Sequence, residues 1–404
     1  MSSNLQDIKD EKKLLKYTYF LCFTCFLNLS ILKQPFDKMA MIMAGVICLL
    51  IGYSYFIIRK FFSDGDKYIF IFSSILSIIG MVILYRINIL YSIKQIVWFA
   101  LGVTEFILMV VLLPDLERFS KYKYCYCIIT IIFMATATFF GKDINGSKSW
   151  IIVHGYSFQP SEFGKLFLVL YLASELKDYR SLRHLIKPAI VVAICLVFTL
   201  IQKSLGFSLI IFCISITMLF ISTSKLRYIL TSFILFAIGC VISYKLFAHV
   251  RVRVLIWKNP WSYANNIGYQ VVQSMISIAS GGFTGVGLGL GHPEFVPVNY
   301  TDFIFAVICE ELGILMGFAV ILINFLLFYR CIRVAIYEKD NFLRLLVVGY
   351  STMIASQVLV IIGGVINAIP LTGITLPLVS YGGSSMLSIF FSLGIVQKIS
   401  ENSI

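Results

Sequence analysis

The sequence predicts an all-α polytopic membrane protein with about 12 transmembrane helices, and three observations support this fold class. Hydrophobic residues make up 59% of the 404 positions, while charged residues make up only 13%. The apolar residues gather in runs of about membrane length, roughly 20 residues. Most Lys and Arg residues fall between these runs. Such a composition excludes a soluble enzyme with a single membrane anchor.

Twelve apolar runs can be counted along the chain. They are residues 14–32, 39–58, 68–85, 95–113, 124–140, 161–175, 187–201, 205–222, 228–244, 303–329, 343–368 and 376–397. The runs 161–175 and 187–201 are short, and they are also compatible with tilted or partly re-entrant helices.

The positive charges set the orientation of these helices. With the N-terminus inside, cytoplasmic segments hold 21 of the 33 Lys and Arg residues and external loops hold 11. This bias is the one that the positive-inside rule expects, and it places both termini in the cytoplasm. The net charge of +13 is thus explained by topology and by contact with anionic membrane lipids, so no nucleic-acid partner is expected.

Three regions follow from this topology. Residues 1–13 form a polar cytoplasmic tail, and the first apolar run is expected to be a retained anchor because no small-residue cleavage pattern follows it. Residues 14–140 hold the N-terminal helices. Residues 141–404 hold the remaining helices and two long outer loops, 141–159 and 245–301. The ten cysteines lie mostly inside apolar runs, where cysteine acts as a small hydrophobe, so no metal site is predicted from them.

The glycine-rich stretch 281–291 lies in the second outer loop and is too rich in glycine for a regular helix. Its glycines permit positive φ angles and a close backbone approach to a ligand or to a neighbouring helix. A nucleotide-binding interpretation is disfavoured, because the stretch lacks a strand–turn–helix context and faces outward.

Asp302 is a leading candidate for a chemical role, because ionisable groups at the edge of hydrocarbon are costly and usually functional. It follows the outer loop and is predicted to open the tenth helix, where the helix dipole would keep it ionised; the alternative is a simple helix cap. Glu310 and Glu311 lie about 80° and 180° around the helix from Asp302. They cannot both share its face, so pairing with a buried cation or a neighbouring helix is favoured for them.

Glu162 and Lys165 form a second constellation at the start of the sixth helix, where Pro160 suits the first turn. They are three residues apart and share one helix face, so an ion pair is predicted. A purely structural ion pair is the alternative to a functional one. Either way, the pair is expected to line the same cavity as Asp302.

Three residues of the outer loops are suited to an anionic substrate at the membrane surface. Arg253 offers a planar cation that matches phosphate, and Lys148 adds a point charge beside the amphipathic ring of Trp150. Trp257 and Trp261 are better explained as interfacial anchors.

Four stretches of the chain resemble the SEDS family (shape, elongation, division and sporulation), the RodA/FtsW/SpoVE group of peptidoglycan glycosyltransferases. They are GSKSW at 146–150 with QPSEFGK at 159–165, RVLIWKNPW at 253–261 with GYQVVQS at 268–274, TDFIFAVICEELG at 301–313 and PLTGITLPLVSYGGSS at 370–385. The resemblance runs from about residue 135 to the C-terminus. A family core usually has ten helices, so the first two helices here would be additions.

The resemblance implies a protein that polymerises lipid II, an undecaprenyl-diphosphate-linked disaccharide peptide, outside the bacterial cytoplasmic membrane beside a class B penicillin-binding protein. Asp302 matches the family's essential aspartate, which is taken to be the catalytic base. The substrate-binding residues implied by the matching stretches and by the outer-loop cations are Lys148, Trp150, Gln159, Ser161, Glu162, Lys165, Arg253, Gln270, Ser274, Glu310, Ser380 and Ser384.

The chain departs from the family pattern at three places. Ser149 stands where an arginine often precedes the tryptophan, Gln202–Gly206 loses the aspartate of a QPDLG-like turn, and 297–303 lacks the acidic and histidine positions of a PEAHTDF-like approach. The sequence does not distinguish a role in cell elongation, division or sporulation.

A glycosyl transfer from a lipid diphosphate needs one base and positive charge for the leaving group, rather than the two carboxylates of a hydrolase. Asp302 with Arg253 and Lys148 meets that requirement, and Mg²⁺ or Mn²⁺ could share the second role, although no dedicated ligand set is visible. The alternatives are a transporter of lipid-linked precursors and a non-catalytic cell-wall scaffold. Transporters usually place their ionisable residues near the membrane midplane rather than at the rim.

Overall fold

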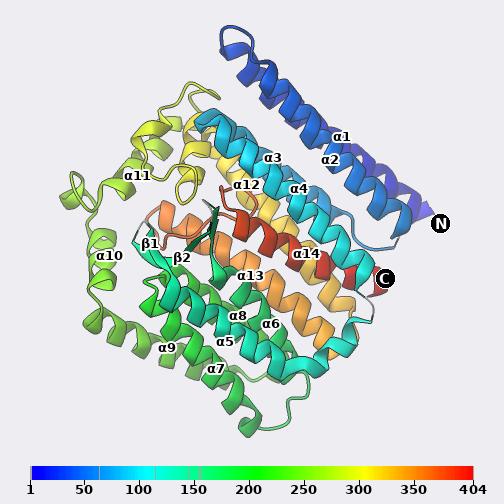
Figure 1. Ribbon diagram of the computed structural model, residues 1–404, viewed down its shortest axis with the longest axis vertical. Helices are drawn as coiled ribbons and strands as arrows, with labels where there is room; N and C mark the ends of the chain where they lie inside the picture. The colour runs from blue at the N-terminus through cyan, green and yellow to red at the C-terminus, as the bar shows by residue number, and fades with distance from the viewer. Residues whose placement is uncertain (1, 63, 114, 145, 154–155, 404) are drawn as a thin grey trace.

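The computed structural model describes residues 2–62, 64–113, 115–144, 146–153 and 156–403, which form a bundle of long helices (Figure 1). The first five helices are α1 (Ser2–Leu32), α2 (Lys38–Phe61), α3 (Tyr68–Ile87), α4 (Ile89–Leu112) and α5 (Lys123–Phe140), with the 3-10 helix η1 (Leu116–Tyr122) before α5. The next five are α6 (Pro160–Leu176), α7 (Leu182–Ile201), α8 (Leu205–Thr223), α9 (Leu226–Leu246) and α10 (Ala248–Lys258). The last four are α11 (Tyr269–Gly281), α12 (Ile304–Tyr337), α13 (Asn341–Val365) and α14 (Gly383–Ser403), with the short 3-10 helices η2 (Trp261–Tyr263) and η3 (Pro293–Phe295) in the outer loop.

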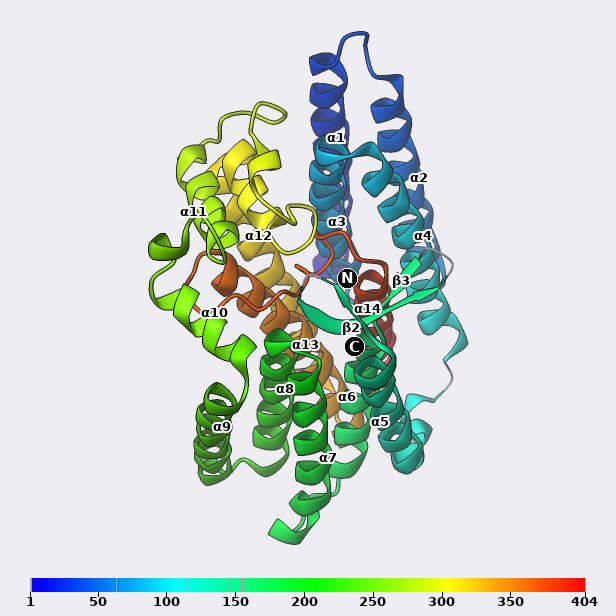
Figure 2. The same ribbon diagram turned by 60° about the vertical axis from the view of Figure 1, so that its left-hand side comes forward.

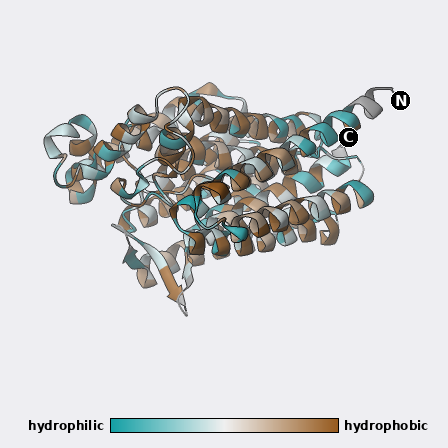
Figure 3. Cartoon of the chain, turned by 90° about the horizontal axis from the view of Figure 1, so that it is seen from above, coloured by the Kyte–Doolittle hydropathy of each residue, from teal (hydrophilic) through white to brown (hydrophobic). Residues whose placement is uncertain are grey.

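Within the described residues, ten helices are long and apolar enough to cross a membrane, which confirms the polytopic all-α class. Each of the twelve predicted runs overlaps a helix, but α6 and α14 are not among the ten. α6 has only 17 residues. α14 ends in the polar sequence QKISENS. Hydrophobic colour follows the middle of the bundled helices, and hydrophilic colour gathers at their ends and in the loops (Figure 3).

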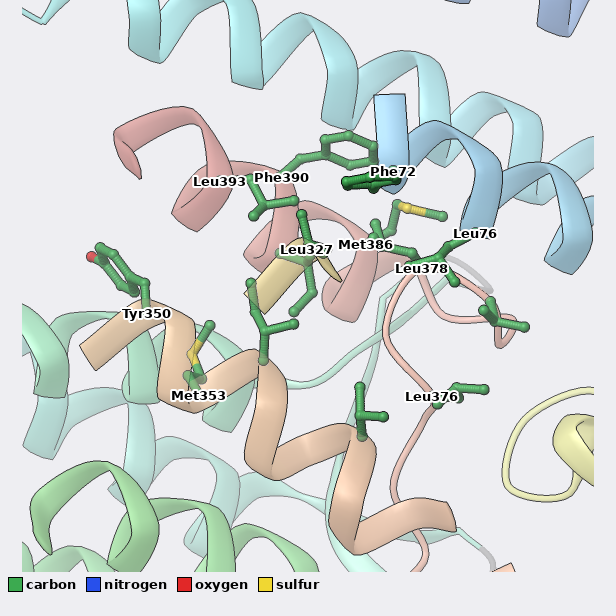
Figure 4. Packing of buried hydrophobic residues seen from close by; sticks show 14 of the residues in the cluster. Phe72, Leu76, Leu327, Tyr350, Met353, Leu376, Leu378, Met386, Phe390 and Leu393 are labelled. Atoms are coloured by element: carbon green, nitrogen blue, oxygen red, sulfur yellow. The ribbon is translucent and has the colours of Figure 1, made fainter. Parts of the chain in front are cut away.

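Helix α3 is the centre of one half of the bundle. Every residue from Ile69 to Tyr85 is buried, which suits a helix that is apolar on all sides. The α1–α2 hairpin lies along its outer side (Figures 1 and 2). On the other side, buried residues of four helices and one loop pack together (Figure 4). These include Phe72, Leu76, Leu327, Tyr350, Met353, Leu376, Leu378, Met386, Phe390 and Leu393.

The two outer loops contain more regular structure than the sequence suggested. The first forms a small antiparallel sheet of strands β1 (Lys142–Ile144), β2 (Ser147–Val153) and β3 (Tyr156–Phe158), in the order β1-β2-β3. β-branched residues in β2, such as Ile151 and Ile152, favour this extended form. The second loop contains α10 and α11, which Figure 2 shows beside α12 and α13.

The glycine-rich stretch packs its backbone directly against a break in α12. Gly313 interrupts α12 with φ 81° and ψ 168°. Around this break, Val286 N donates to Glu310 O at 3.0 Å, and Ile314 N donates to Gly282 O at 3.0 Å. A Cβ atom on Gly285 would collide with the Glu311 carbonyl, so no other residue fits there. The predicted close approach to a neighbouring helix is therefore confirmed.

The two ends of the chain lie at the same end of the bundle (Figure 1). Glu401 of α14 accepts hydrogen bonds from the backbone N–H groups of Asp64 and Gly65, and it forms an ion pair with the buried Lys67 at 3.3 Å. Near the other terminus, Glu11 of α1 pairs with Arg59 of α2 at 3.4 Å. The contacts of Glu401 attach α14 to the turn that leads from the hairpin into α3, and the Glu11–Arg59 pair joins α1 to α2.

Candidate functional site

Asp302 lies in a turn just before α12 and does not itself open the helix as predicted. The backbone N–H groups of Thr301 and Phe303 both donate to Val298 O, at 3.2 and 3.4 Å, and the helix begins only at Ile304. The N-cap position belongs to Phe303, which makes no side-chain cap. The cap explanation for Asp302 is therefore not supported by the hydrogen bonds of this helix end.

The carboxyl group of Asp302 is half-buried and its pKa is raised. Burial raises the pKa of Asp302 to about 6, against the opposing effects of a hydrogen bond with the Thr301 side chain and the charge of Arg253. A carboxylate of this kind is still mostly ionised at neutral pH. It is also a better proton acceptor than an ordinary aspartate.

Arg253 of α10 reaches the loop between α13 and α14. Its Nη1 atom donates to the carbonyl oxygens of Leu371 and Thr372, both at 3.0 Å. A Cβ atom added to Gly373 would lie 3.5 Å from Asp302 Oδ2 and 3.8 Å from Arg253 Nη2, so the acid and the cation flank this glycine. Burial lowers the pKa of Arg253 and the charge of Asp302 raises it.

The serine-rich loop before α14 holds the Asp302 turn in place. Ser380 Oγ donates to Thr301 O at 2.6 Å and accepts from Leu376 N at 2.8 Å. Tyr381 N donates to Tyr300 O at 2.9 Å. The hydroxyl group of Ser380 thus already has protein partners on both sides. The stretch 376–382 was predicted to be helical, but it forms this loop and α14 begins at Gly383.

Glu162 and Lys165 form the predicted ion pair, at 2.7 Å, and their side chains are 3% and 0% exposed. Lys165 Nζ also donates to Gln357 Oε1 of α13 at 2.7 Å. Ser388 of α14 donates to Glu162 Oε2 at 2.8 Å. Gln357 in turn donates to Thr375 O at 3.0 Å. The pair therefore supports the loop at 371–380 from below.

Gln159 and Ser161, at the start of α6, also make contacts inside the protein. Gln159 N donates to Ser384 Oγ at 3.1 Å, which connects α6 to the start of α14. Ser161 Oγ donates to Gln202 Oε1 at 3.0 Å. The carbonyl of Gln202 accepts from Lys148 N at 2.9 Å, so the small sheet is tied to the turn between α7 and α8.

Two of the places where the chain departs from the pattern it resembles, Ser149 and the turn at 202–206, have identified contacts. Ser149 is fully buried and accepts a hydrogen bond from Gln159 Nε2 at 3.3 Å. Lys203, in the turn that lacks the family's aspartate, pairs with Asp143 of β1 at 3.0 Å. Lys148 is exposed and Trp150 is half-buried, so both side chains keep surface that a ligand could contact.

Glu310 and Glu311 are both held by the outer loop. Glu310 accepts from Ser277 Oγ and from His292 N, each at 2.9 Å. Glu311 accepts from Gly289 N at 2.9 Å and pairs with Arg86 of α3 at 3.0 Å. Glu311 is thus paired with a cation, although Arg86 is partly exposed rather than buried.

Ser274 of α11 donates to Val365 O at 3.0 Å, and Gln270, one turn earlier, is half-buried. The side chain of Trp257, predicted to be an anchor, donates to Asn367 O at 3.1 Å. These contacts attach the outer-loop helices α10 and α11 to the end of α13.

The structure thus brings Asp302, Arg253 and Ser380 together around the loop 371–380, with Glu162 and Lys165 below it. Two residues of α4 contact the end of this loop and were not singled out from the sequence: Gln95 donates to Ser380 O, and the ring of Tyr91 packs against Tyr381. Neither residue stands out in the sequence, since a tyrosine and a glutamine at the start of an apolar run suggest only a polar helix end. Within the described residues, no group of three or more His, Cys, Asp or Glu residues is close enough to hold a metal ion.

A profile of the FtsW/RodA/SpoVE family of cell-cycle proteins matches residues 66–404, so α1 and α2 precede the matched part. The chain is 32% identical to the peptidoglycan glycosyltransferase RodA of Mycobacterium tuberculosis over 381 residues, covering 87% of this chain and 81% of the relative. It is 34% identical to the stage V sporulation protein E of Bacillus subtilis over 287 residues, covering 69% and 77%.

Two solved structures have a similar fold. One is a chain of a peptidoglycan synthase complex described as coordinating polymerization and crosslinking, with a TM-score of 0.73, 26% identity and coverage of 84% of this chain and 99% of that one. The other is the rod shape determining protein RodA of Thermus thermophilus, with a TM-score of 0.64, 24% identity and coverage of 85% and 99%.

Proposed function

Because the chain belongs to the SEDS family of peptidoglycan glycosyltransferases, we propose that it polymerises lipid II into β-1,4 glycan strands with Asp302 as the base. The observation that carries the proposal is the placement of a half-buried aspartate and a guanidinium on either side of Gly373. One group accepts a proton and the other stabilises negative charge, which are the two tasks of this transfer.

In the proposed reaction, Asp302 takes the proton from the acceptor sugar hydroxyl as that oxygen attacks the anomeric carbon of the donor. The diphosphate departs with the bonding electron pair, and Arg253 and Lys148 stabilise its charge. A magnesium or manganese ion bound through the substrate's diphosphate would supply further positive charge. A single displacement inverts the anomeric carbon, so an α-linked donor gives a β-linked product.

The remaining predicted site residues divide by their surroundings. Lys148, Trp150 and Gln270 keep accessible side chains, which supports direct contact with lipid II. The others have hydrogen bonds or ion pairs inside the protein, which supports a role in shaping the site. They are Gln159, Ser161, Glu162, Lys165, Ser274, Glu310, Ser380 and Ser384.

The proposed topology has twelve membrane crossings, with both termini in the cytoplasm and Asp302 outside. Its support is that both chain ends lie at one end of the bundle, while α10, α11 and the small sheet lie toward the other (Figures 1 and 2). α1 and α2 would then be two helices added to a ten-helix core, in agreement with the start of the family match at residue 66.

The proposed partner is a class B penicillin-binding protein in the bacterial cytoplasmic membrane. The similarity to a chain of a peptidoglycan synthase complex supports this assignment. Membrane lipids would cover the apolar outer faces of helices such as α9, in which Ser243 is the one buried residue.

The test is polymerisation of labelled lipid II by the purified protein, alone and with its cognate penicillin-binding protein, with the glycan products resolved by length. Wild type should give a ladder, and Asp302→Ala and Asp302→Asn should give none. Asp178→Asn, which removes an exposed carboxylate at the other end of the bundle, is the matched control and should keep the ladder.

Three outcomes would overturn the proposal. A ladder of normal intensity from folded Asp302→Ala protein would show that Asp302 is not the base. Lipid II translocation by wild type without any polymer would favour a transporter, and binding of the partner without either activity would favour a scaffold.

A further inference from the structure

Gln95 of α4 is a buried amide with both of its ends in use. It is only 1% exposed. Its Nε2 atom donates to Ser380 O at 3.1 Å, and its Oε1 atom accepts from Gly382 N at 3.2 Å. A single side chain therefore replaces two missing backbone partners of the loop before α14, and an amide is the residue type that can donate and accept at once.

Tyr91 lies one turn before Gln95 and thus on the same face of α4. Its ring stacks on Tyr300 with centroids 4.5 Å apart, and it contacts Tyr381 with centroids 5.2 Å apart. Tyr300 and Tyr381 are themselves edge-to-face at 6.2 Å. The three rings come from α4, from the turn before α12 and from the loop before α14.

These contacts lead directly to Asp302. Tyr381 N donates to Tyr300 O at 2.9 Å, and Ser380 Oγ donates to Thr301 O at 2.6 Å. Tyr300 and Thr301, the two residues before Asp302, are therefore hydrogen-bonded to Tyr381 and Ser380. Those two residues in turn contact Tyr91 and Gln95.

We propose that Gln95 and Tyr91 are positioning residues that set the place of the Asp302 carboxylate through the Ser380–Tyr381 loop. The proposal rests on Asp302 being the base. Neither residue touches the reacting atoms in this arrangement. Their effect is on geometry, and a displacement of about 1 Å at a reacting group can cost on the order of 100-fold in rate.

The alternative is that α4 only stabilises the fold, and Ser92 provides a control for it. Ser92 is a buried polar residue of α4, 0% exposed, and its hydroxyl donates to Met81 O of α3 at 2.9 Å. Ser92→Ala removes a buried helix–helix hydrogen bond without touching the loop. It should lower the thermal midpoint and leave the turnover number unchanged.

The experiment compares kcat and KM for lipid II polymerisation by Gln95→Leu, Tyr91→Ala, Tyr91→Phe and Ser92→Ala. Gln95→Leu and Tyr91→Ala should lower kcat by about 10- to 100-fold with KM within about threefold of wild type, as expected for lost alignment of a group that acts in the transition state. Tyr91→Phe keeps the stacked ring and should retain most of the activity. Hydrogen–deuterium exchange of residues 298–303 should increase in Gln95→Leu but not in Ser92→Ala.

The proposal is overturned if folded Gln95→Leu and Tyr91→Ala both keep wild-type kcat, or if Ser92→Ala loses as much kcat as they do. Should Gln95→Leu fail to fold, the pair Tyr91→Ala and Tyr91→Phe gives the same comparison. Failure of the proposed function has a different result, since wild type itself would then form no glycan ladder.

Discussion

The replacement of Lys165 by methionine should destabilise the protein more than the removal of any solvent-exposed charge. Lys165 is completely buried, and its ammonium group contacts Glu162 and Gln357, each at 2.7 Å. Methionine fills a similar volume but leaves a buried carboxylate without its cation. We expect a loss of about 4–8 kcal/mol in the free energy of unfolding, because an uncompensated buried charge costs about 3–5 kcal/mol and an unsatisfied acceptor on Gln357 adds about 1–3 kcal/mol.

The assay is a denaturation titration in detergent micelles, followed by circular dichroism and by loss of the monodisperse peak in size-exclusion chromatography. The double variant Glu162→Gln/Lys165→Met removes both charges and should recover at least half of the lost free energy. Lys203→Met is the matched control, because Lys203 and its partner Asp143 are 43% and 48% exposed. Its cost should stay within about 1 kcal/mol.

A cost below about 1 kcal/mol for Lys165→Met, in the range of ordinary surface substitutions, would refute this reasoning. So would a double variant that is less stable than Lys165→Met alone. Either result would mean that water or a neighbouring cation reaches Glu162 when Lys165 is absent.

Three further predictions concern Asp302, Arg86 and Gly313. Because burial raises the pKa of Asp302 to about 6 and the base must be ionised, the polymerisation rate should rise with pH through about 6 and become level above about 7; a limb centred near 4 would contradict this. Arg86→Met leaves the buried Glu311 without its cation, so exchange of residues 287–292 should become faster, and unchanged protection would argue against a structural pair. Gly313→Ala places a Cβ against the Phe283 carbonyl at φ 81° and should cost about 1–3 kcal/mol, whereas Gly45→Ala, with open space around it, should be neutral in the same thermal scan.

The sequence was sufficient to predict the helices because a membrane span needs a long apolar run, and every such run here overlaps a helix. It was less reliable for the helix ends. Residues 376–382 are apolar enough to continue a helix, but their backbone groups bind Gln95 and Tyr300 instead. Local composition does not report a partner that is 285 residues away, as Gln95 is from Ser380.

The candidate site was predicted in a similarly uneven way. Asp302, Glu162 and Lys165 are conspicuous because charge is rare in this chain, and Arg253 is conspicuous because its chemistry suits phosphate. Tyr91 and Gln95 are not conspicuous, since an aromatic residue and an amide near a membrane surface are ordinary. The break of α12 at Gly313 was also missed, because a single glycine in an apolar run is common in membrane helices.

The buried pair on α6 also constrains how the chain enters the membrane during synthesis. Glu162 and Lys165 lie within one helical turn, so each neutralises the other before any later helix is made. The second partner of Lys165, Gln357, is synthesised 192 residues later. If α6 spans the membrane as proposed, it would enter the lipid as a self-neutralised segment, and Lys165 would gain its Gln357 contact only once α13 is made. The interior of the bundle is completed only when the C-terminal helices arrive.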